Sequence, residues 1–201
     1  MTRGSTIGDL PSGTVTFLFT DIEGSTRLLR ETGETYSDIL DLHHDLLREV
    51  WQRHGGVEVS TDGDSFFVAF ADADAAVAAA VDGQRALASA QWPGVASVAV
   101  RMGLHRGYGR PVGHDYRSLA VHQAARVVDA ANGGQILATA EVVGADRVET
   151  SDAYDVTGLG RYRVRDFDEP VDLFGVSVPD LTVDPRPPRV RPADSHNLVR
   201  P

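Results

Sequence analysis

The sequence predicts one α+β domain of the ferredoxin-like, split βαβ kind, with helices on one face of a mostly antiparallel sheet. The main reason is the order of segments: strand, helix, two strands, helix, strand, helix, strand, short helix and a closing hairpin. The length is consistent with this fold class, because 201 residues suffice for one domain with a sizeable core and a tail. Composition agrees as well: 42% hydrophobic and 24% charged residues are typical of a soluble globular protein.

The first half of the domain alternates clear strand and helix patterns. Residues 14–20 are rich in β-branched and aromatic types and predict a strand, after which Ser25 is a candidate helix cap. Between 35 and 54, apolar residues recur every three to four positions, which predicts an amphipathic helix that Gly55-Gly56 ends. Residues 57–61 and 65–70 then form a predicted hairpin around Asp62-Gly63-Asp64.

The second half continues with elements that we predict in the following order. They are a helix over 72–90, a strand over 99–104, a glycine-rich turn region over 106–113, a helix over 119–131, a strand over 135–138, a short helix over 139–146, and a hairpin of 155–165 with 171–178. Asn132-Gly133-Gly134 provides the stop after the third long helix.

Three regions follow from these patterns. Residues 1–13 are polar and contain Gly and Pro, so we expect a flexible arm before a domain that spans 14–178. Residues 179–201 contain six of the ten prolines, and we interpret them as a proline-rich tail or linker.

Composition also excludes several classes of function. There is no cysteine, which excludes disulfides, thiolate zinc sites and a cysteine nucleophile. The net charge of −10 argues against nucleic acid and anionic membranes as partners. No apolar run approaches membrane-spanning length, so a cytoplasmic protein is expected. All 19 basic residues are arginine, so this chain has no lysine for any reaction or contact that requires one.

Two acidic turns beside apolar strands are the candidate metal site. Asp21 ends the first predicted strand, and Asp64 lies in the turn of the central hairpin. If the sheet brings them together, their repulsion is relieved by a divalent cation, to which the Ile22 carbonyl could add an oxygen ligand. Each residue also has a structural explanation, with Asp21 at a helix start and Asp64 in a turn.

The residues after Asp21 are suited to phosphate. Gly24, Ser25 and Thr26 open a predicted helix, and backbone amides at a helix start bind phosphate oxygens. A paired-metal site for a phosphorylated ligand is therefore the prediction from residue chemistry alone.

Four motifs in order resemble a known family. They are Phe17 to Thr26, Gly63-Asp64-Ser65-Phe66, Asp115-Tyr116 and Val121 to Arg126. Together they are similar to the class III adenylate/guanylate cyclase catalytic domain, and closest to the bacterial branch found in actinobacteria. The resemblance runs from about Thr14 to Val178 and implies the class III nucleotidyl cyclase fold.

The resemblance implies a two-metal phosphoryl transfer. Two Mg²⁺ or Mn²⁺ ions bind a nucleoside triphosphate, expected to be ATP with GTP as the alternative, and the ribose 3′-oxygen displaces pyrophosphate to give a 3′,5′-cyclic nucleotide. Asp21, Asp64 and the Ile22 carbonyl match the metal ligands. Arg126 matches the arginine that steadies the reacting phosphate, and His122 stands where the family has a transition-state asparagine.

Base recognition departs from the family pattern. Asp115 matches the aspartate that reads the adenine amino group, but Ser60 stands at the position of the adenine-reading lysine. The metal motif also reads Gly-Asp-Ser where the family usually has Gly-Asp-Gly. Because serine brings neither charge nor reach, we expect weaker or altered base selectivity.

The resemblance also implies a head-to-tail homodimer with two shared active sites. Arg163 or Arg165 of the closing hairpin is a further candidate contact to the triphosphate. The end of the tail is similar to the join between cyclase domains and a downstream ATPase or regulatory segment. The two alternatives are a short stand-alone relative and a domain excised from a longer protein, and the second would have a regulatory domain or partner downstream. The alternative to an enzyme is a degenerate cyclase-like domain that binds nucleotide or dimerises to regulate a partner, which Ser60 and His122 would favour.

Overall fold

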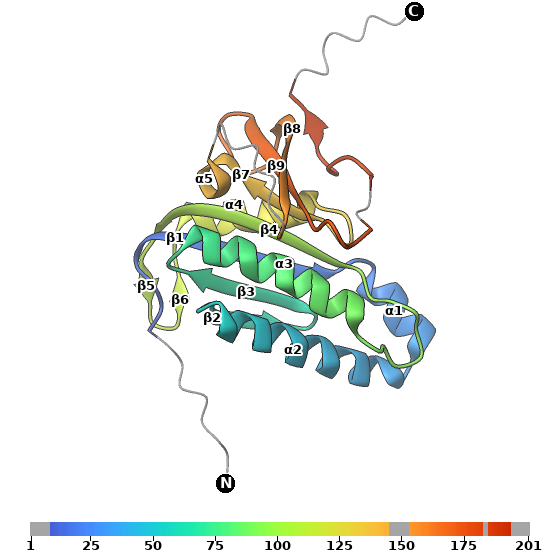
Figure 1. Ribbon diagram of the computed structural model, residues 1–201. Helices are drawn as coiled ribbons and strands as arrows, with labels where there is room; N and C mark the ends of the chain where they lie inside the picture. The colour runs from blue at the N-terminus through green and yellow to red at the C-terminus, as the bar shows by residue number, and fades with distance from the viewer. Residues whose placement is uncertain (1–8, 145–152, 183–184, 194–201) are drawn as a thin grey trace, which may run out of the picture.

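The computed structural model describes residues 9–144, 153–182 and 185–193, and its elements surround one large mixed sheet (Figure 1). The elements are β1 (Gly13–Ile22), α1 (Ser25–Thr32), α2 (Thr35–Arg53), β2 (Val57–Asp62), β3 (Ser65–Phe70), α3 (Ala73–Ser89), β4 (Val100–Gly109), β5 (Pro111–Val112), β6 (Asp115–Tyr116), α4 (Leu119–Ala130), β7 (Ile136–Thr139), α5 (Ala140–Val143), β8 (Asp155–Arg163), β9 (Val171–Ser177) and β10 (Arg191–Pro192).

The sheet has eight strands in the order β10-β8-β9-β7-β4-β1-β3-β2, and β5 pairs with β6 in a separate hairpin. Strand β1 lies between β3 and β4 and is antiparallel to both, while β4 and β7 form a parallel pair. Because β1 is central, successive residues such as Phe17 and Leu18 are buried on opposite faces. The predicted α+β class and the mostly antiparallel sheet are confirmed.

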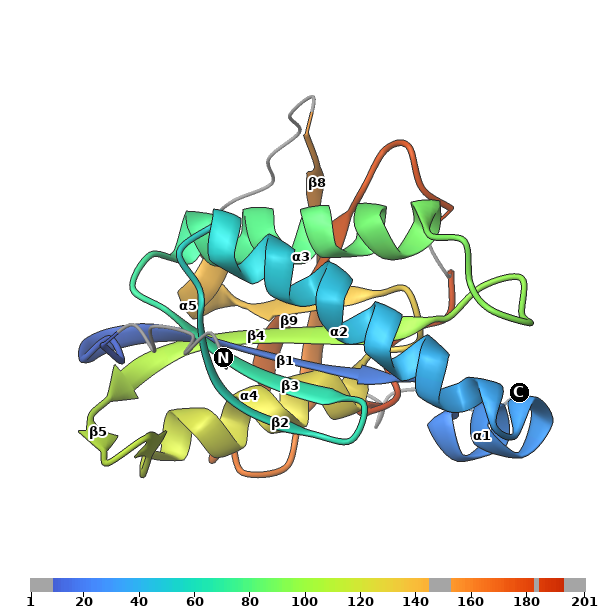
Figure 2. The same cartoon turned by 90° about the horizontal axis from the view of Figure 1, so that it is seen from below.

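The prediction that helices cover one face of the sheet is wrong, because helices cover both (Figure 2). Leu18 and Met102 belong to the core beneath α2 and α3, whereas Phe17 packs in a second cluster with Ala120 and Ala124 of α4. Apolar periodicity shows that a helix has a buried stripe, but it does not show which side of a sheet that stripe covers.

Helix α4 lies very close to the sheet at Gly103. A Cβ atom built at Gly103 would stand 2.2 Å from the backbone nitrogen of Val128. Only glycine permits this approach, so Gly103 determines how deeply α4 is seated.

Strand β4 is longer than predicted. It runs to Gly109, through residues that we expected to form a turn, because β1 pairs with it as far as Gly13↔Gly109. Gly107 and Gly109 fit this strand because Ala120 and Phe17 press against them. Ser25 is also not the cap of α1: Gly24 is the N-cap, with a left-handed φ of 72°, and Ser25 is the first helical residue.

The described part of the predicted tail makes contacts with the domain. Residues 185–193 lie against the domain, and Arg191–Pro192 add β10 to the edge strand β8. The expected short helix is confirmed only as α5, and its predicted end lies outside the described residues. Residues 1–8 of the expected arm are also outside them.

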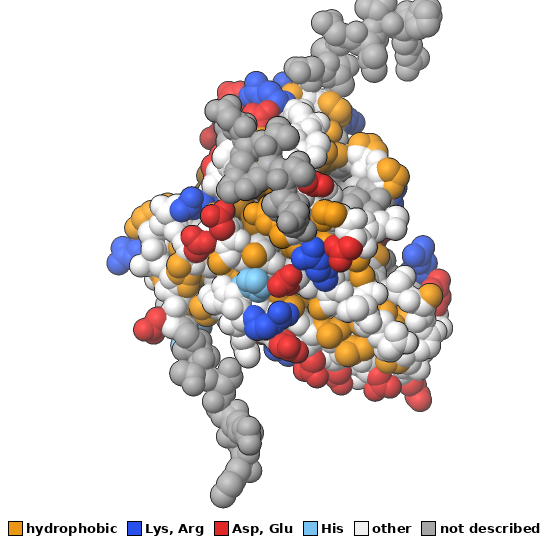
Figure 3. Space-filling view, in the orientation of Figure 1, with side chains coloured by type: hydrophobic (Ala, Val, Ile, Leu, Met, Phe, Trp, Pro, Cys, Tyr) orange, Lys and Arg blue, Asp and Glu red, His pale blue; other side chains and the backbone are white. Residues whose placement is uncertain are grey.

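Surface charge follows the composition. Figure 3 shows acidic side chains gathered along the edge of the molecule formed by α2. The exposed acidic residues of this helix and of its N-terminus are Glu34, Asp38, Asp41, Asp45 and Glu49. Across residues 9–144, 153–182 and 185–193, no helix combines the length and the apolar character needed to cross a membrane.

Candidate active site

The two predicted metal carboxylates meet at one end of the sheet. Asp21 is the penultimate residue of β1, and Asp64 lies in the turn between β2 and β3. The backbone N–H of Ile22 donates a hydrogen bond to Asp64 Oδ2 at 2.9 Å, which holds the turn against the end of β1. Pairing of β1 with β3 creates this contact, because the hairpin returns its turn to the strand end.

Arg101 is a member of this site that the sequence analysis missed. It lies opposite Asp21 in the ladder between β1 and β4, and its guanidinium binds both carboxylate oxygens of Asp21. The Arg101 Nε to Asp21 Oδ1 distance is 2.7 Å. The sequence signal was an arginine in an otherwise apolar strand, but its meaning depends on the register between β1 and β4.

Electrostatics at Asp21 favour a cation. Burial raises the pKa of Asp21, and the negative charges of Asp64 and Asp129 raise it further, while Arg101 opposes the shift. A carboxylate that is desolvated beside a second carboxylate is stabilised in its ionised form by positive charge. Arg101 supplies that charge in this structure, and a bound divalent cation would supply it more strongly.

The residues at this site fit Mg²⁺ or Mn²⁺ chemistry. Among the described residues, no group of three or more His, Cys, Asp or Glu side chains could hold a metal by itself. A cation here would therefore be held by two carboxylates, the Ile22 carbonyl, water and ligand oxygens. That incomplete oxygen shell is the usual way in which Mg²⁺ is bound next to substrate phosphates.

The predicted phosphate loop directly follows these carboxylates. Gly24 accepts hydrogen bonds from the backbone N–H groups of Arg27 and Leu28, so the chain turns sharply into α1. Gly24 and Thr26 are exposed and Ser25 is partly exposed, which leaves the start of the helix open to a ligand. The left-handed backbone at Gly24 is a conformation that glycine adopts without strain.

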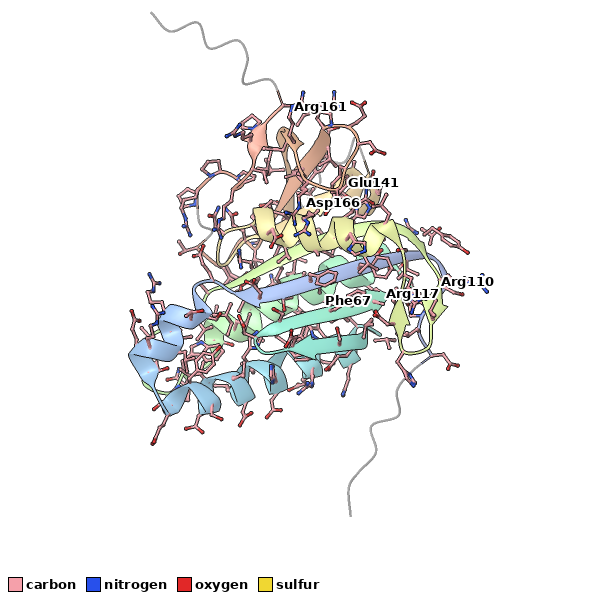
Figure 4. The ribbon with its side chains drawn as sticks, turned by 180° about the vertical axis from the view of Figure 1, so that it is seen from behind. Phe67, Arg110, Arg117, Glu141, Arg161 and Asp166 are labelled. Carbon is pink, nitrogen blue, oxygen red and sulfur yellow. The ribbon has the colours of Figure 1, made fainter. Side chains whose placement is uncertain are left out.

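His122 and Arg126 lie one turn apart on α4, as predicted, but Arg126 is already engaged. Its Nε donates to Asp166 at 2.7 Å and its Nη1 to Asp129 at 2.9 Å. These bonds raise the pKa of Arg126 and lower that of Asp166. Figure 4 shows Asp166 beside α4. A phosphate that binds Arg126 must therefore compete with two carboxylates.

The predicted base-reading positions, Ser60 and Asp115, lie on the α4 face of the sheet. Ser60 pairs with Phe67 in the β2–β3 ladder, and the Phe67 and Tyr116 rings are 6.2 Å apart. Asp115 adjoins Tyr116 and is exposed, with Oδ1 accepting the Tyr116 N–H at 2.7 Å. Phe19 stacks on Phe67 with ring centroids 4.4 Å apart. Figure 4 shows Phe67 over the sheet on this side.

The two hairpin arginines differ in their surroundings. Arg163 pairs with Arg191 of β10 at the sheet edge, away from the other site residues along the strand order. Arg165 Nε lies 3.8 Å from Asp166 Oδ2, in the ion-pair group around Arg126. The structure therefore brings Arg165, and not Arg163, next to the α4 residues.

The geometry thus has a carboxylate pair followed by an open helix start, and a second group of polar residues along α4. A family model described as the adenylate and guanylate cyclase catalytic domain matches residues 9–174. The chain belongs to this family. The match covers every predicted site residue from Asp21 to Arg126.

Relatives support the same family. An adenylate cyclase of Mycosarcoma maydis is 36% identical over 160 residues, which are 66% of this chain and 6% of that protein. A receptor-type adenylate cyclase of Trypanosoma congolense is 31% identical over 202 residues, which are 80% of this chain and 27% of that protein. The chain thus spans only a small part of the length of these relatives. They are a fungal and a trypanosomal protein, so the bacterial branch stays a prediction.

Solved structures confirm the fold. A Trypanosoma brucei adenylate cyclase in its monomeric state superposes with a TM-score of 0.77 at 28% identity, covering 88% of this chain and 95% of that one. The guanylate cyclase domain of RhGC from Catenaria anguillulae in complex with GTP has a TM-score of 0.71 at 19% identity, covering 83% and 97%. The class III cyclase fold predicted from the motifs is therefore confirmed.

Proposed function

We propose that this domain is a nucleotidyl cyclase that converts a nucleoside triphosphate, ATP in the first place, into a 3′,5′-cyclic nucleotide and pyrophosphate. The observation that supports this most is the meeting of Asp21 and Asp64 beside an open helix start. Two carboxylates next to the amides of an exposed helix start suit a metal–triphosphate complex.

The residues of the chain have distinct roles in this proposal. Asp21, Asp64 and the Ile22 carbonyl would hold two divalent cations, Mg²⁺ or Mn²⁺. When bound, these ions lower the pKa of the ribose 3′-hydroxyl and neutralise the triphosphate. The amides of residues 24–26 bind phosphate oxygens, and Arg126 donates hydrogen bonds to the phosphate as its charge rises.

Arg101 adds a role that follows from its ion pair with Asp21. With a divalent cation bound at Asp21, this ion pair would be weaker and the Arg101 guanidinium could donate to the triphosphate instead. Arginine binds phosphate in the same two-pronged geometry as carboxylate. We therefore assign Arg101 to the triphosphate, with Arg165 as a second contact.

His122 and Asp115 complete the substrate contacts. A ring N–H of His122 can donate to the ribose or phosphate in place of the family's asparagine amide, and Asp115 accepts from the adenine amino group. Ser60 offers only a short hydroxyl on the same face, so the preference for ATP over GTP is expected to be weak.

A head-to-tail homodimer is part of the proposal, with Asp21 and Asp64 of one copy facing Arg126 of the other. Exposed apolar side chains near Asp115 support it. Tyr108 is 70%, Leu119 57% and Val112 46% exposed, all around the β5–β6 hairpin and the start of α4. Such a cluster is typical of a surface that a second copy covers.

The alternative function is a regulatory cyclase-like domain that binds nucleotide or dimerises without turnover. The double ion pair of Arg126 favours it, because a phosphate must displace Asp129 and Asp166. We rank the enzyme first, since all groups that neutralise charge are present and these contribute most to such reactions. A cytoplasmic location and a downstream regulatory domain or partner remain part of the proposal.

The deciding experiment measures cyclic nucleotide formation by the purified chain, with ATP and GTP separately, in Mn²⁺ and then Mg²⁺. Asp64→Ala is run beside it, with Asp62→Ala as the control because Asp62 is an exposed acidic residue of the same hairpin. Product that vanishes in Asp64→Ala and persists in Asp62→Ala supports the enzyme. No product from a confirmed dimer at high concentration would favour the regulatory alternative, and equal activity in both variants would refute the metal assignment.

A further inference from the structure

The C-terminal strap, which we define as residues 185–193, contacts both halves of the candidate site. It lies on the same side of the sheet as α4, where Val190 packs on the core cluster that includes Val127 and Ala130. Pro188 is buried, and the strap ends as β10 with the Ala193 N–H donating to the Arg161 carbonyl at 2.8 Å. These contacts give a proline-rich segment a fixed path across the domain.

One end of the strap reaches residues 22–24, which join β1 to α1 beside Asp21 and which we call the metal loop. Arg186 Nη2 donates to Glu23 Oε2 at 3.1 Å, and Glu23 stands between Ile22, a predicted metal ligand, and Gly24, a predicted phosphate-binding residue. The Glu23 side chain also presses on the loop after α4, because a Cβ atom at Gly133 would lie 3.0 Å from Glu23 Oε2. The metal loop, the α4–β7 loop and the strap therefore meet at Glu23.

The middle of the strap holds the end of α4 and the loop that follows it. The Arg189 N–H donates to the carbonyl of Ala130 at 2.7 Å, which satisfies one of the carbonyls left open at the end of the helix. Asn132 Nδ2 donates to the Pro187 carbonyl at 3.0 Å, and Gln135 Nε2 to the Arg186 carbonyl at 2.7 Å. Asn132 and Gln135 are themselves buried, so these bonds replace lost contacts with water.

Residues 185–188 of the strap are held more by hydrogen bonds than by close packing. A cavity of about 300 Å³ remains between residues 185–188 and strands β7, β8 and β9. A segment held by a few polar contacts over a cavity opens at lower free energy than the core does. It can therefore respond to whatever follows it in the chain without unfolding the domain.

We propose that the strap positions the metal loop relative to α4, with Arg186 as a positioning residue that acts through Glu23. The functional part rests on the proposed cyclase dimer, in which Asp21 of each copy serves one shared site and α4 of the same copy serves the other. Movement of the strap would then change metal binding at Asp21 and the seating of α4 together. This would give a downstream segment or partner a direct route to the site.

The test compares Arg186→Gln with Arg189→Gln in the full chain. Both variants remove one strap arginine, but the contact of Arg189 with α4 uses its backbone N–H, so its side chain is a matched control. Amide hydrogen exchange is measured for residues 22–24 and 132–135. We expect faster exchange in both segments for Arg186→Gln, near wild-type exchange for Arg189→Gln, and recovery in Arg186→Lys, which keeps the charge opposite Glu23.

A second measurement addresses function. Arg186→Gln should weaken Mn²⁺ binding by roughly 2- to 30-fold, and Mn²⁺ should slow exchange of strap amides in the wild type. Identical exchange at 22–24 and 132–135 in the two variants would overturn the proposal. A wild-type chain that binds no Mn²⁺ would overturn the metal assignment and the functional part, while the exchange comparison would still decide whether the strap positions the loop.

Discussion

His43 makes the fold sensitive to acid. Its side chain is fully buried in α2, and neither ring nitrogen has a hydrogen-bond partner among the described residues. Burial, together with the positive charges of His44 and Arg48, lowers the pKa of His43 from 6.5 to about 3. The unfolded chain therefore binds a proton in mildly acidic solution that the folded chain does not.

The sign and size of the effect follow from this difference. Because the folded chain keeps His43 neutral, the contribution of this residue to the free energy of unfolding is fully present above about pH 6.5. It is lost as the pH falls from 6.5 towards 3. Between pH 7 and pH 5 the loss amounts to about 2 kcal/mol, and over the whole interval to about 5 kcal/mol. His43→Leu removes the titrating group and two unpaired polar atoms, so it should abolish this part of the slope and stabilise the fold at pH 5.

The assay is urea unfolding at pH 7, 6 and 5, followed by tryptophan fluorescence. Trp51 is buried and its ring centroid is 6.3 Å from that of Phe66, which also contacts His43, so its emission reports on this part of the core. His114→Leu is the control, because His114 is exposed on the β5–β6 turn. If His43→Leu lost as much stability between pH 7 and 5 as the wild type and this control, the interpretation of His43 would be refuted.

Three further predictions concern the site. Gly103→Ala would place a Cβ 2.2 Å from the backbone nitrogen of Val128, so α4 must shift. We expect the free energy of unfolding in urea to fall by about 1–3 kcal/mol, and the proposed cyclase activity to fall strongly. Full stability in that variant would contradict the close packing. Arg101→Gln removes the competitor for Asp21, so Mn²⁺ titration without nucleotide should show tighter binding while KM for the nucleotide rises; unchanged Mn²⁺ affinity would argue against competition. Ser60→Lys restores the family's base-reading side chain and should raise the ratio of activity with ATP to activity with GTP several-fold. An unchanged ratio would mean that Ser60 does not limit base recognition.

Much of the fold was readable from local patterns. Helices α2, α3 and α4 lie within one or two residues of their predicted limits, because apolar periodicity and glycine stops act over short distances. The approach of Asp64 to the end of β1 was also predictable, because a hairpin returns its turn to a neighbouring strand. The predicted end of β4 was wrong. The glycines of residues 106–113 are typical of a turn, but pairing with β1 keeps this segment extended as far as Gly109.

The sequence by itself determined the order of the long helices and of the main strands, the family and the residues that carry its motifs, because these depend on short-range spacing and on residue type. It did not determine the short strands β5, β6 and β10. The tertiary structure decided three further points: that helices cover both faces of the sheet, that Arg101 pairs with Asp21, and that the strap joins Glu23 to α4. Each of these is a contact between segments distant in the chain. Strand register and chain path set such contacts, and no local pattern of residues encodes them.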